Sequence, residues 1–231
     1  MARVELLQVS VHRTIRTVWK EVSPPMPSQL SIGQRLLLQQ KIHVAAGAYA
    51  QVGRGVQTHF SSGWSAAIGV AHLLGGLPEA AIRWWAAQPN GHLLLTAGDN
   101  AYANSALVDG EILYAVVAVP IDWLVEDETR ALAAALCPLD HLLGCGGGDE
   151  GWLSDGSGIT PRWRRVGEQI AHLFSLGYGS NDASRRDPHV YLADGLALAM
   201  TDRQALNVND PKLERLLAAS LLSTGFWHNA R

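Results

Sequence analysis

Three prolines, each directly after a residue with a side-chain oxygen, constrain how the C-terminal part of this chain can fold. They occur in the pairs Thr160-Pro161, Asp187-Pro188 and Asp210-Pro211. A threonine or aspartate that precedes a helix can accept a hydrogen bond from a first-turn N–H, and proline fits the first helical position because no N–H is needed there. The pairs therefore predict three successive helices, each of which begins at its proline.

The N-terminal half of the chain is predicted to mix helices with strands. Apolar residues at helical spacing, runs rich in valine and leucine, and the turn signals between them give the boundaries. Helices are predicted at 29–42, 64–74 and 78–87, strands at 92–96 and 111–121, a turn with a short strand at 47–56, and a loop at 97–110. We therefore expect an α+β fold, with a small mixed or antiparallel sheet in the N-terminal half and a helical C-terminal half.

A proline-rich stretch divides the chain. Residues 23–27 read Ser-Pro-Pro-Met-Pro, which breaks regular structure because proline fixes φ and removes a hydrogen-bond donor. Residues 1–27 are therefore predicted to form an N-terminal arm or an added strand. Residues 28–231 are predicted to form a single α+β domain.

Composition excludes several classes of partner. The 231 residues carry a net charge of −3 and no basic block, so nothing favours nucleic acid or an anionic membrane. The apolar run at 112–121 falls far short of the roughly 18 residues that span a bilayer. The two cysteines build no disulfide framework, and the N-terminus lacks the apolar core of a signal peptide. We expect a soluble, cytoplasmic protein with a peptide or protein partner; its oligomeric state is left open.

The stretch Arg130–Gly144 is predicted to be the central buried helix of the domain. Its apolar run 131–139 contains one titratable group, Cys137, which is most simply a small buried side chain. Asp122 is predicted to cap this helix. Pro138 is predicted to interrupt it, because an internal proline removes one hydrogen bond and crowds the preceding turn.

A few charged side chains could carry chemistry. Glu168 and His172 are four residues apart on one predicted helix, so they could share a metal or a proton, or form a simple surface pair. His141 could be oriented by the adjacent Asp140, although neighbours on a helix point in different directions. Asp194 lies in an apolar helix and needs a partner, because an unpaired buried charge is very costly.

The segment Val190–Leu198, followed by Thr201-Asp202 and by residues 210–217, resembles the C-terminal part of gluzincin-type zinc metallopeptidases. The similarity is to the small branch related to the catalytic domain of anthrax lethal factor. In that family such a helix supplies the third zinc ligand. The helix 130–144 is similar to the family's active-site helix, which carries the motif HExxH. The resemblance covers residues 110–225 and implies a metallopeptidase-like fold.

The residues that would give the family its activity are missing from this chain. Ala133, Ala134 and Cys137 fall at the positions of the first histidine, the glutamate and the second histidine of HExxH. Val190 falls at the third ligand, and Asp194 at a second acidic position that does not bind zinc. Alanine and valine neither bind zinc nor move protons. The resemblance therefore implies no catalytic residues and no cofactor, and a binding or structural module built on an inactive metallopeptidase-like domain.

Two other readings remain open. Cys137 and His141 are spaced as two ligands on one helix could be, although Pro138 lies between them; with Glu168 or His172 they could form an atypical site of a metal-dependent hydrolase. Zinc belongs to this alternative alone. In the other reading, the chain is a globular subunit of a complex unrelated to peptidases.

Overall fold

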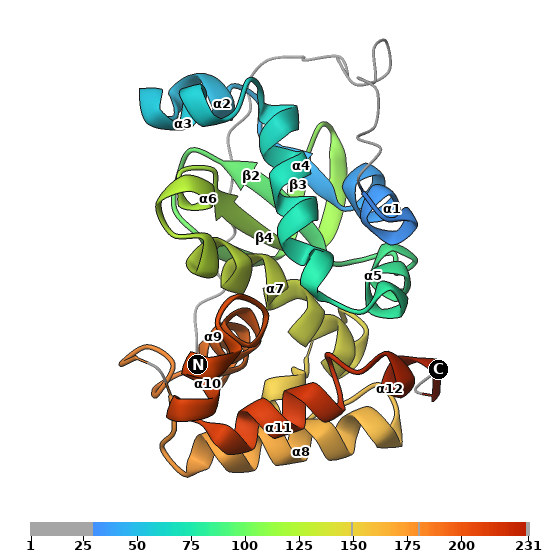
Figure 1. The fold of residues 1–231 in the computed structure, drawn as a ribbon. Helices are drawn as coiled ribbons and strands as arrows, with labels where there is room; N and C mark the ends of the chain where they lie inside the picture. Colours follow the sequence, from blue (N-terminus) through green and yellow to red (C-terminus); the bar gives the residue numbers. More distant parts are fainter. Residues whose placement is uncertain (1–29, 149, 180, 230–231) are drawn as a thin grey trace.

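The computed structural model describes residues 30–148, 150–179 and 181–229, and these form a mixed α+β fold (Figure 1). A four-stranded sheet lies in the N-terminal half, and helices make up the C-terminal half, as the sequence predicts. The predicted arm or added strand at 1–27 lies outside the described residues. In the ranges that the structure describes, no helix has the length and apolar character to cross a membrane.

The sheet combines parallel and antiparallel pairing in the order β1-β2-β4-β3. Strands β1, β2 and β4 are mutually parallel, and β3 runs antiparallel to β4. Residues 92–95 of β2 are all buried: Leu93 and Leu95 lie in the main core, and Leu94 packs on the other face with residues of the β3–β4 hairpin. The strand bounds are Ile42–Val44 for β1, His92–Thr96 for β2, Ala101–Val108 for β3 and Glu111–Pro120 for β4.

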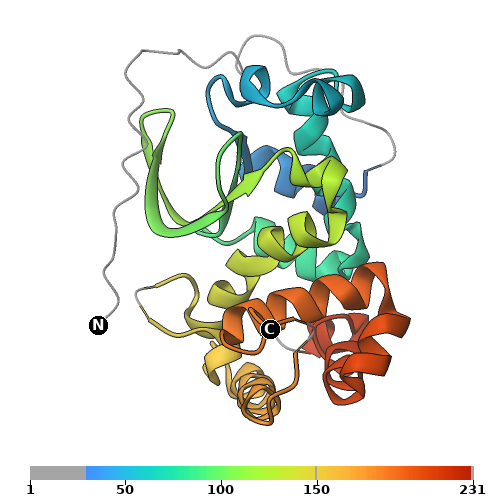
Figure 2. The same ribbon diagram turned by 90° about the vertical axis from the view of Figure 1, so that its left-hand side faces the viewer.

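The predicted loop at 97–110 is wrong, because most of it forms β3. Figure 2 shows β3 and β4 as a long, curved hairpin. Asp109 and Gly110 close it with φ values of 52° and 84°, and Asp-Gly favours such two-residue turns because both residues must adopt positive φ. Alanine, asparagine and serine dominate β3 and have weak strand propensity, so its pairing with β4 decides its structure.

The N-terminal helices largely match the predictions. Ser31 and Ser62 each accept a hydrogen bond from the backbone three residues on and so begin α1 and α4. The region 47–56 is the exception: it forms short helices, not a turn and strand, and Val52 and Val56 are buried there. The bounds are Ile32–Gln40 for α1, Ala48–Gln51 for α2, Arg54–His59 for α3, Gly63–Leu73 for α4 and Glu79–Ala86 for α5.

The central helix begins and continues differently from the prediction. Asp122 is followed by the short helix α6 (Trp123–Glu126), and Asp127 then caps α7 (Glu128–Cys145). Pro138 lies inside α7 without ending it. The helix is buried along most of its length, and we attribute its continuity to this packing, which outweighs the loss of one hydrogen bond at the proline.

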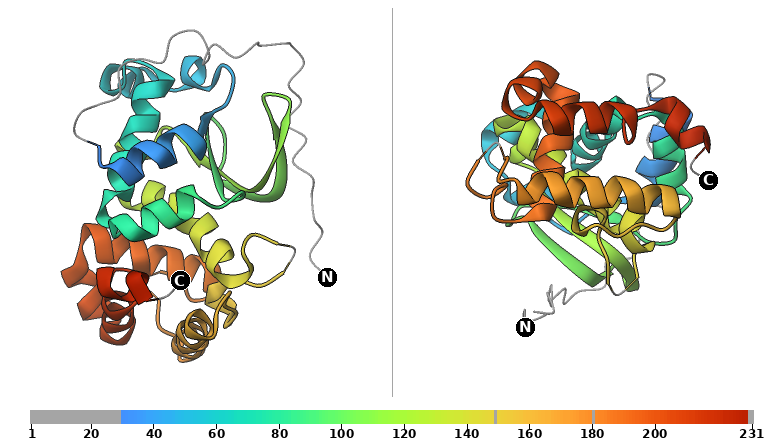
Figure 3. Two further views of the ribbon diagram at one scale, coloured as in Figure 1. Left: turned by 90° about the vertical axis from the view of Figure 1, so that its right-hand side faces the viewer. Right: turned by 90° about the horizontal axis from the view of Figure 1, so that it is seen from below.

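The three predicted helix starts are confirmed. The side chains of Thr160, Asp187 and Asp210 accept hydrogen bonds from first-turn N–H groups at 3.3, 2.8 and 2.9 Å. Figure 3 shows the C-terminal helices gathered on one side of the molecule, with α7 between them and the sheet. The bounds are Pro161–Ser175 for α8, Pro188–Thr201 for α9, Arg203–Asn209 for α10, Pro211–Ala219 for α11 and Thr224–Asn229 for α12.

Candidate functional site: a cavity between α7 and α9

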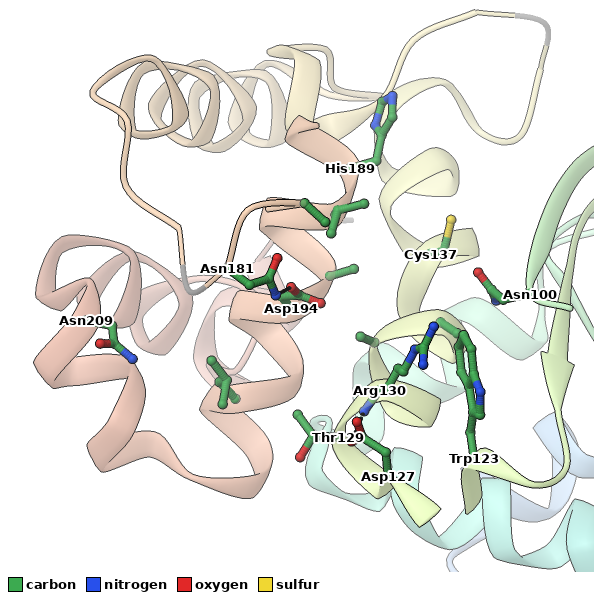
Figure 4. A pocket seen from close by; sticks show the side chains of 16 residues that line it. Asn100, Trp123, Asp127, Thr129, Arg130, Cys137, Asn181, His189, Asp194 and Asn209 are labelled. Atoms are coloured by element: carbon green, nitrogen blue, oxygen red, sulfur yellow. Dashed lines mark hydrogen bonds between the residues drawn. The ribbon is translucent and has the colours of Figure 1, made fainter. Parts of the chain in front are cut away.

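Helices α7 and α9 pack against each other, and a cavity of about 590 Å³ opens beside them. Residues from α6, from the start of α7 and from the segment before β3 line one side of it. The loop before α9 and the end of α10 contribute to the other side (Figure 4). The cavity is thus built by segments far apart in the sequence, around two helices that the sequence does predict.

All five residues that the resemblance places at active-site positions line this cavity. Ala133, Ala134 and Cys137 come from α7, and Val190 and Asp194 come from α9. Residues three or four apart share one face of a helix, so each set faces the cavity together. The structure therefore brings these positions into one place, although their role stays a prediction.

Cys137 is poorly suited to chemistry in this position. Burial raises the pKa of its thiol, and the nearby carboxylate of Asp140 raises it further. The thiolate, and not the thiol, is the nucleophile and the metal ligand. Cys137 is therefore expected to present a neutral, weakly polar surface to the cavity.

Asp194 has the partner that its apolar helix requires. The side-chain amide of Asn181 donates a hydrogen bond to Oδ2 of Asp194 at 2.7 Å. Asn181 belongs to the loop before α9 and also lines the cavity. The expectation that Asp194 has a partner is confirmed, and the pair ties this loop to α9.

On the opposite side of the cavity, the side chain of Arg130 lies over the ring of Trp123. The guanidinium of Arg130 lies 3.7 Å from the centroid of the Trp123 ring, a cation–π distance. Asp127 caps α7 by accepting the backbone N–H of Arg130 at 3.0 Å. Asn100, next to them in Figure 4, donates its amide to the carbonyl oxygen of Ala118 at 2.7 Å.

A second polar group, His189, lies at one end of the cavity. Its Nδ1 is 2.8 Å from Oγ of Ser154, and that hydroxyl is 2.7 Å from Oδ2 of Asp140. The carboxylate accepts the hydroxyl proton, so Nδ1–H of His189 is assigned as the donor to Ser154. On the other side of the ring, Nε2 lies 3.7 Å from Oδ2 of Asp155.

The charges around His189 favour its protonated form. Burial lowers the pKa of the imidazole, but the hydrogen bonding and charge of Asp140, with the charges of Asp155 and Asp187, raise it by more. The net effect is a raised pKa. The ring also packs on Trp152, with centroids 4.3 Å apart, and a contact with an aromatic ring favours the protonated form as well.

The glycines and acidic residues of the loop 144–158 are typical of a solvated connector, so sequence reasoning misses this cluster. Instead, Leu153 and Ser154 are fully buried in a short 3-10 turn. Gly144 permits this, because a Cβ there would lie 2.4 Å from the carbonyl oxygen of Gly151. The glycine at the end of α7 is the sequence signal that could have indicated the close return of the loop.

Cys137 and His141, the two central residues of the alternative metal site, make different contacts. Cys137 lines the cavity, but the His141 ring is stacked on Trp152 with centroids 4.5 Å apart, and its Nδ1 is hydrogen-bonded to the hydroxyl of Tyr102. Burial lowers the pKa of His141. Asp140 does not orient this histidine and faces Ser154 instead.

Glu168 and His172 lie elsewhere. Both are exposed on α8, and neither lines the cavity. Within the described ranges, no group of three or more histidine, cysteine, aspartate or glutamate side chains has a geometry that could hold a metal ion. The zinc of the alternative reading therefore stays a prediction.

Comparisons with protein-family models, with curated proteins and with solved structures found no match to the chain. The resemblance to gluzincin-type metallopeptidases accordingly rests on the residues quoted above.

Proposed function

We propose that this protein is a metallopeptidase-like domain without catalysis of its own, which serves as a binding module. In this proposal a segment of peptide chain occupies the cavity between α7 and α9. One observation carries it: the five positions that the resemblance assigns to the active site line a single cavity, and three of them are alanine or valine. Such side chains leave space where ligands and a base would stand, and contribute no chemistry.

The cavity has the size and the lining that a peptide segment requires. Its volume of about 590 Å³ lies within the roughly 300–1,000 Å³ of pockets that enclose ligands. The small side chains of Ala133, Ala134 and Ala193 allow a backbone to approach α7 and α9 closely. Asn100 and Asn209, on opposite sides of the pocket in Figure 4, carry amides that can pair with peptide N–H and C=O groups.

A cavity-filling variant tests the proposal. Ala193→Trp places a large side chain in the cavity, and Ala50→Trp makes the same change at an exposed position on α2 as a control. An array of short random peptides is probed with the wild type and with both variants. We expect a set of peptides that bind the wild type and Ala50→Trp but not Ala193→Trp.

Circular dichroism and urea unfolding show whether each variant is folded. If Ala193→Trp does not fold, the variant Ala134→Phe, at a half-buried position, fills the cavity in its place. Peptide binding that is equal in the wild type and in a folded, filled variant would refute the proposal. Failure of the wild type to bind any peptide would also refute it.

A further inference from the structure

The positive charge of Arg130 is unfavourable at its position in α7. It occupies the third residue of α7, where the helix dipole disfavours a cation by a few tenths of a kcal/mol or more. Among the described residues, no carboxylate forms an ion pair with its guanidinium. The contact that holds the group is the Trp123 ring at 3.7 Å.

The guanidinium of Arg130 keeps hydrogen-bond donors that no carboxylate among the described residues takes up in an ion pair. Asp127 already accepts the backbone N–H of Arg130, and Asp194 already accepts the amide of Asn181. The guanidinium of Arg130 carries five N–H donors, and stacking on a ring face leaves their edge directions open. A negatively charged acceptor can therefore pair with the open edge of this guanidinium.

We propose that the cavity recognises a carboxylate, and that Arg130 is the residue that binds it. This inference rests on the proposed function for the peptide that carries the group, while the carboxylate itself can be tested separately. A guanidinium edge pairs with a carboxylate through two parallel hydrogen bonds. Trp123 positions Arg130 by fixing the plane of the guanidinium.

The carboxylate has two sources in a peptide: the C-terminus and an acidic side chain. Figure 4 shows Arg130 and Trp123 across the pocket from Asp194 and Asn181. The remainder of the peptide would therefore extend from Arg130 along α7 and α9, over the alanines. Both sources offer the same carboxylate group. They differ in the modification that removes binding: amidation of the C-terminus for one, and replacement of the acidic side chain by its amide for the other.

A small probe tests the carboxylate site without any peptide. 3-Phenylpropionate and its uncharged amide are titrated into the protein, and the indole N–H signal of Trp123 is followed by ¹⁵N NMR. We expect the acid to shift this signal and the amide to leave it in place. Arg130→Gln should abolish the shift, whereas Arg165→Gln, an exposed arginine of α8 outside the cavity, should retain it. An equal response to acid and amide overturns the inference.

Synthetic peptides provide a second test of the carboxylate site. Those that depend on the open cavity are synthesised as C-terminal acids and amides, and with each aspartate or glutamate replaced by its amide. Loss of the charged hydrogen bonds should weaken binding about 10- to 100-fold in Arg130→Gln. The preference for the acid should shrink as salt is raised, because Arg130 is exposed.

The two proposals fail in different ways. Cavity-dependent peptides that bind equally well in charged and neutral forms would refute the carboxylate site and leave the proposed function standing. A response to 3-phenylpropionate that requires Arg130, in a protein that binds no peptide, would support the carboxylate site and refute the peptide-binding function.

Discussion

Two histidines side by side in the sheet should make the fold sensitive to acid. His43 on β1 and His92 on β2 lie with Nε2 and Nδ1 3.0 Å apart, and Nε2 of His92 is 3.0 Å from the carbonyl oxygen of Pro89. His92 therefore donates to Pro89 and accepts from His43, which requires the His92 ring to be neutral. Burial, with the charge of the nearby Lys41, lowers the pKa of each histidine to about 4.

The sign and size of the effect follow from these pKa values. Each histidine titrates near 6.5 in the unfolded chain and near 4 in the folded one, so between these values the unfolded chain binds more protons. The free energy of unfolding therefore rises with pH from about 4 to 6.5 and is lost as pH falls through this window. Integration over one histidine gives a loss of roughly 2 kcal/mol at pH 5, relative to pH 7.5.

The variant His43→Gln isolates one of the two titrations. The glutamine amide can still donate to His92, so the hydrogen bond is retained while one proton-binding group is removed. Urea unfolding, followed by tryptophan fluorescence at pH 7.5 and pH 5, should show that the wild type loses roughly 2 kcal/mol more than the variant. His59→Gln, at an exposed position on α3, controls for the loss of a histidine. An identical pH dependence in the wild type and His43→Gln would refute the reasoning.

Two further predictions concern metal and the glycine-rich loop. Protein purified without chelator should contain no stoichiometric zinc by elemental analysis. The reason is that burial favours the thiol form of Cys137, and His141 is hydrogen-bonded to Tyr102. One zinc per chain would support the atypical metal site instead. Gly144→Ala should lower the free energy of unfolding by about 1–3 kcal/mol, because its Cβ would lie 2.4 Å from a backbone oxygen. Gly148→Ala, where the nearest atom is 3.7 Å away, should be close to neutral, and equal effects at the two positions would contradict the packing argument.

Local signals were sufficient for the elements that are stabilised by neighbours in sequence. The caps at Thr160, Asp187 and Asp210 act within one helical turn, so their residue types predict the helix starts directly. The strand at 92–96 is predicted correctly for a similar reason, because its apolar run has the length and flanks of a buried strand.

Elements that depend on distant partners could not be predicted in this way. β3 exists because β4 pairs with it, and α7 continues through Pro138 because packing along the helix outweighs a local cost. Ser154 was overlooked because it acquires its role only when the loop at 144–158 returns over α7 and brings it to Asp140 and His189.

The sequence alone determined that this chain forms a helical C-terminal half after a mixed N-terminal half, and that Ala133, Ala134 and Val190 offer no chemistry. Helix caps and side-chain chemistry depend on the residue itself and its near neighbours, so they can be read without coordinates. Only the tertiary structure decided that these positions face one cavity, and that Arg130 lies on Trp123 at its wall. Such an arrangement depends on how α7 and α9 pack, and packing joins residues that no local pattern connects.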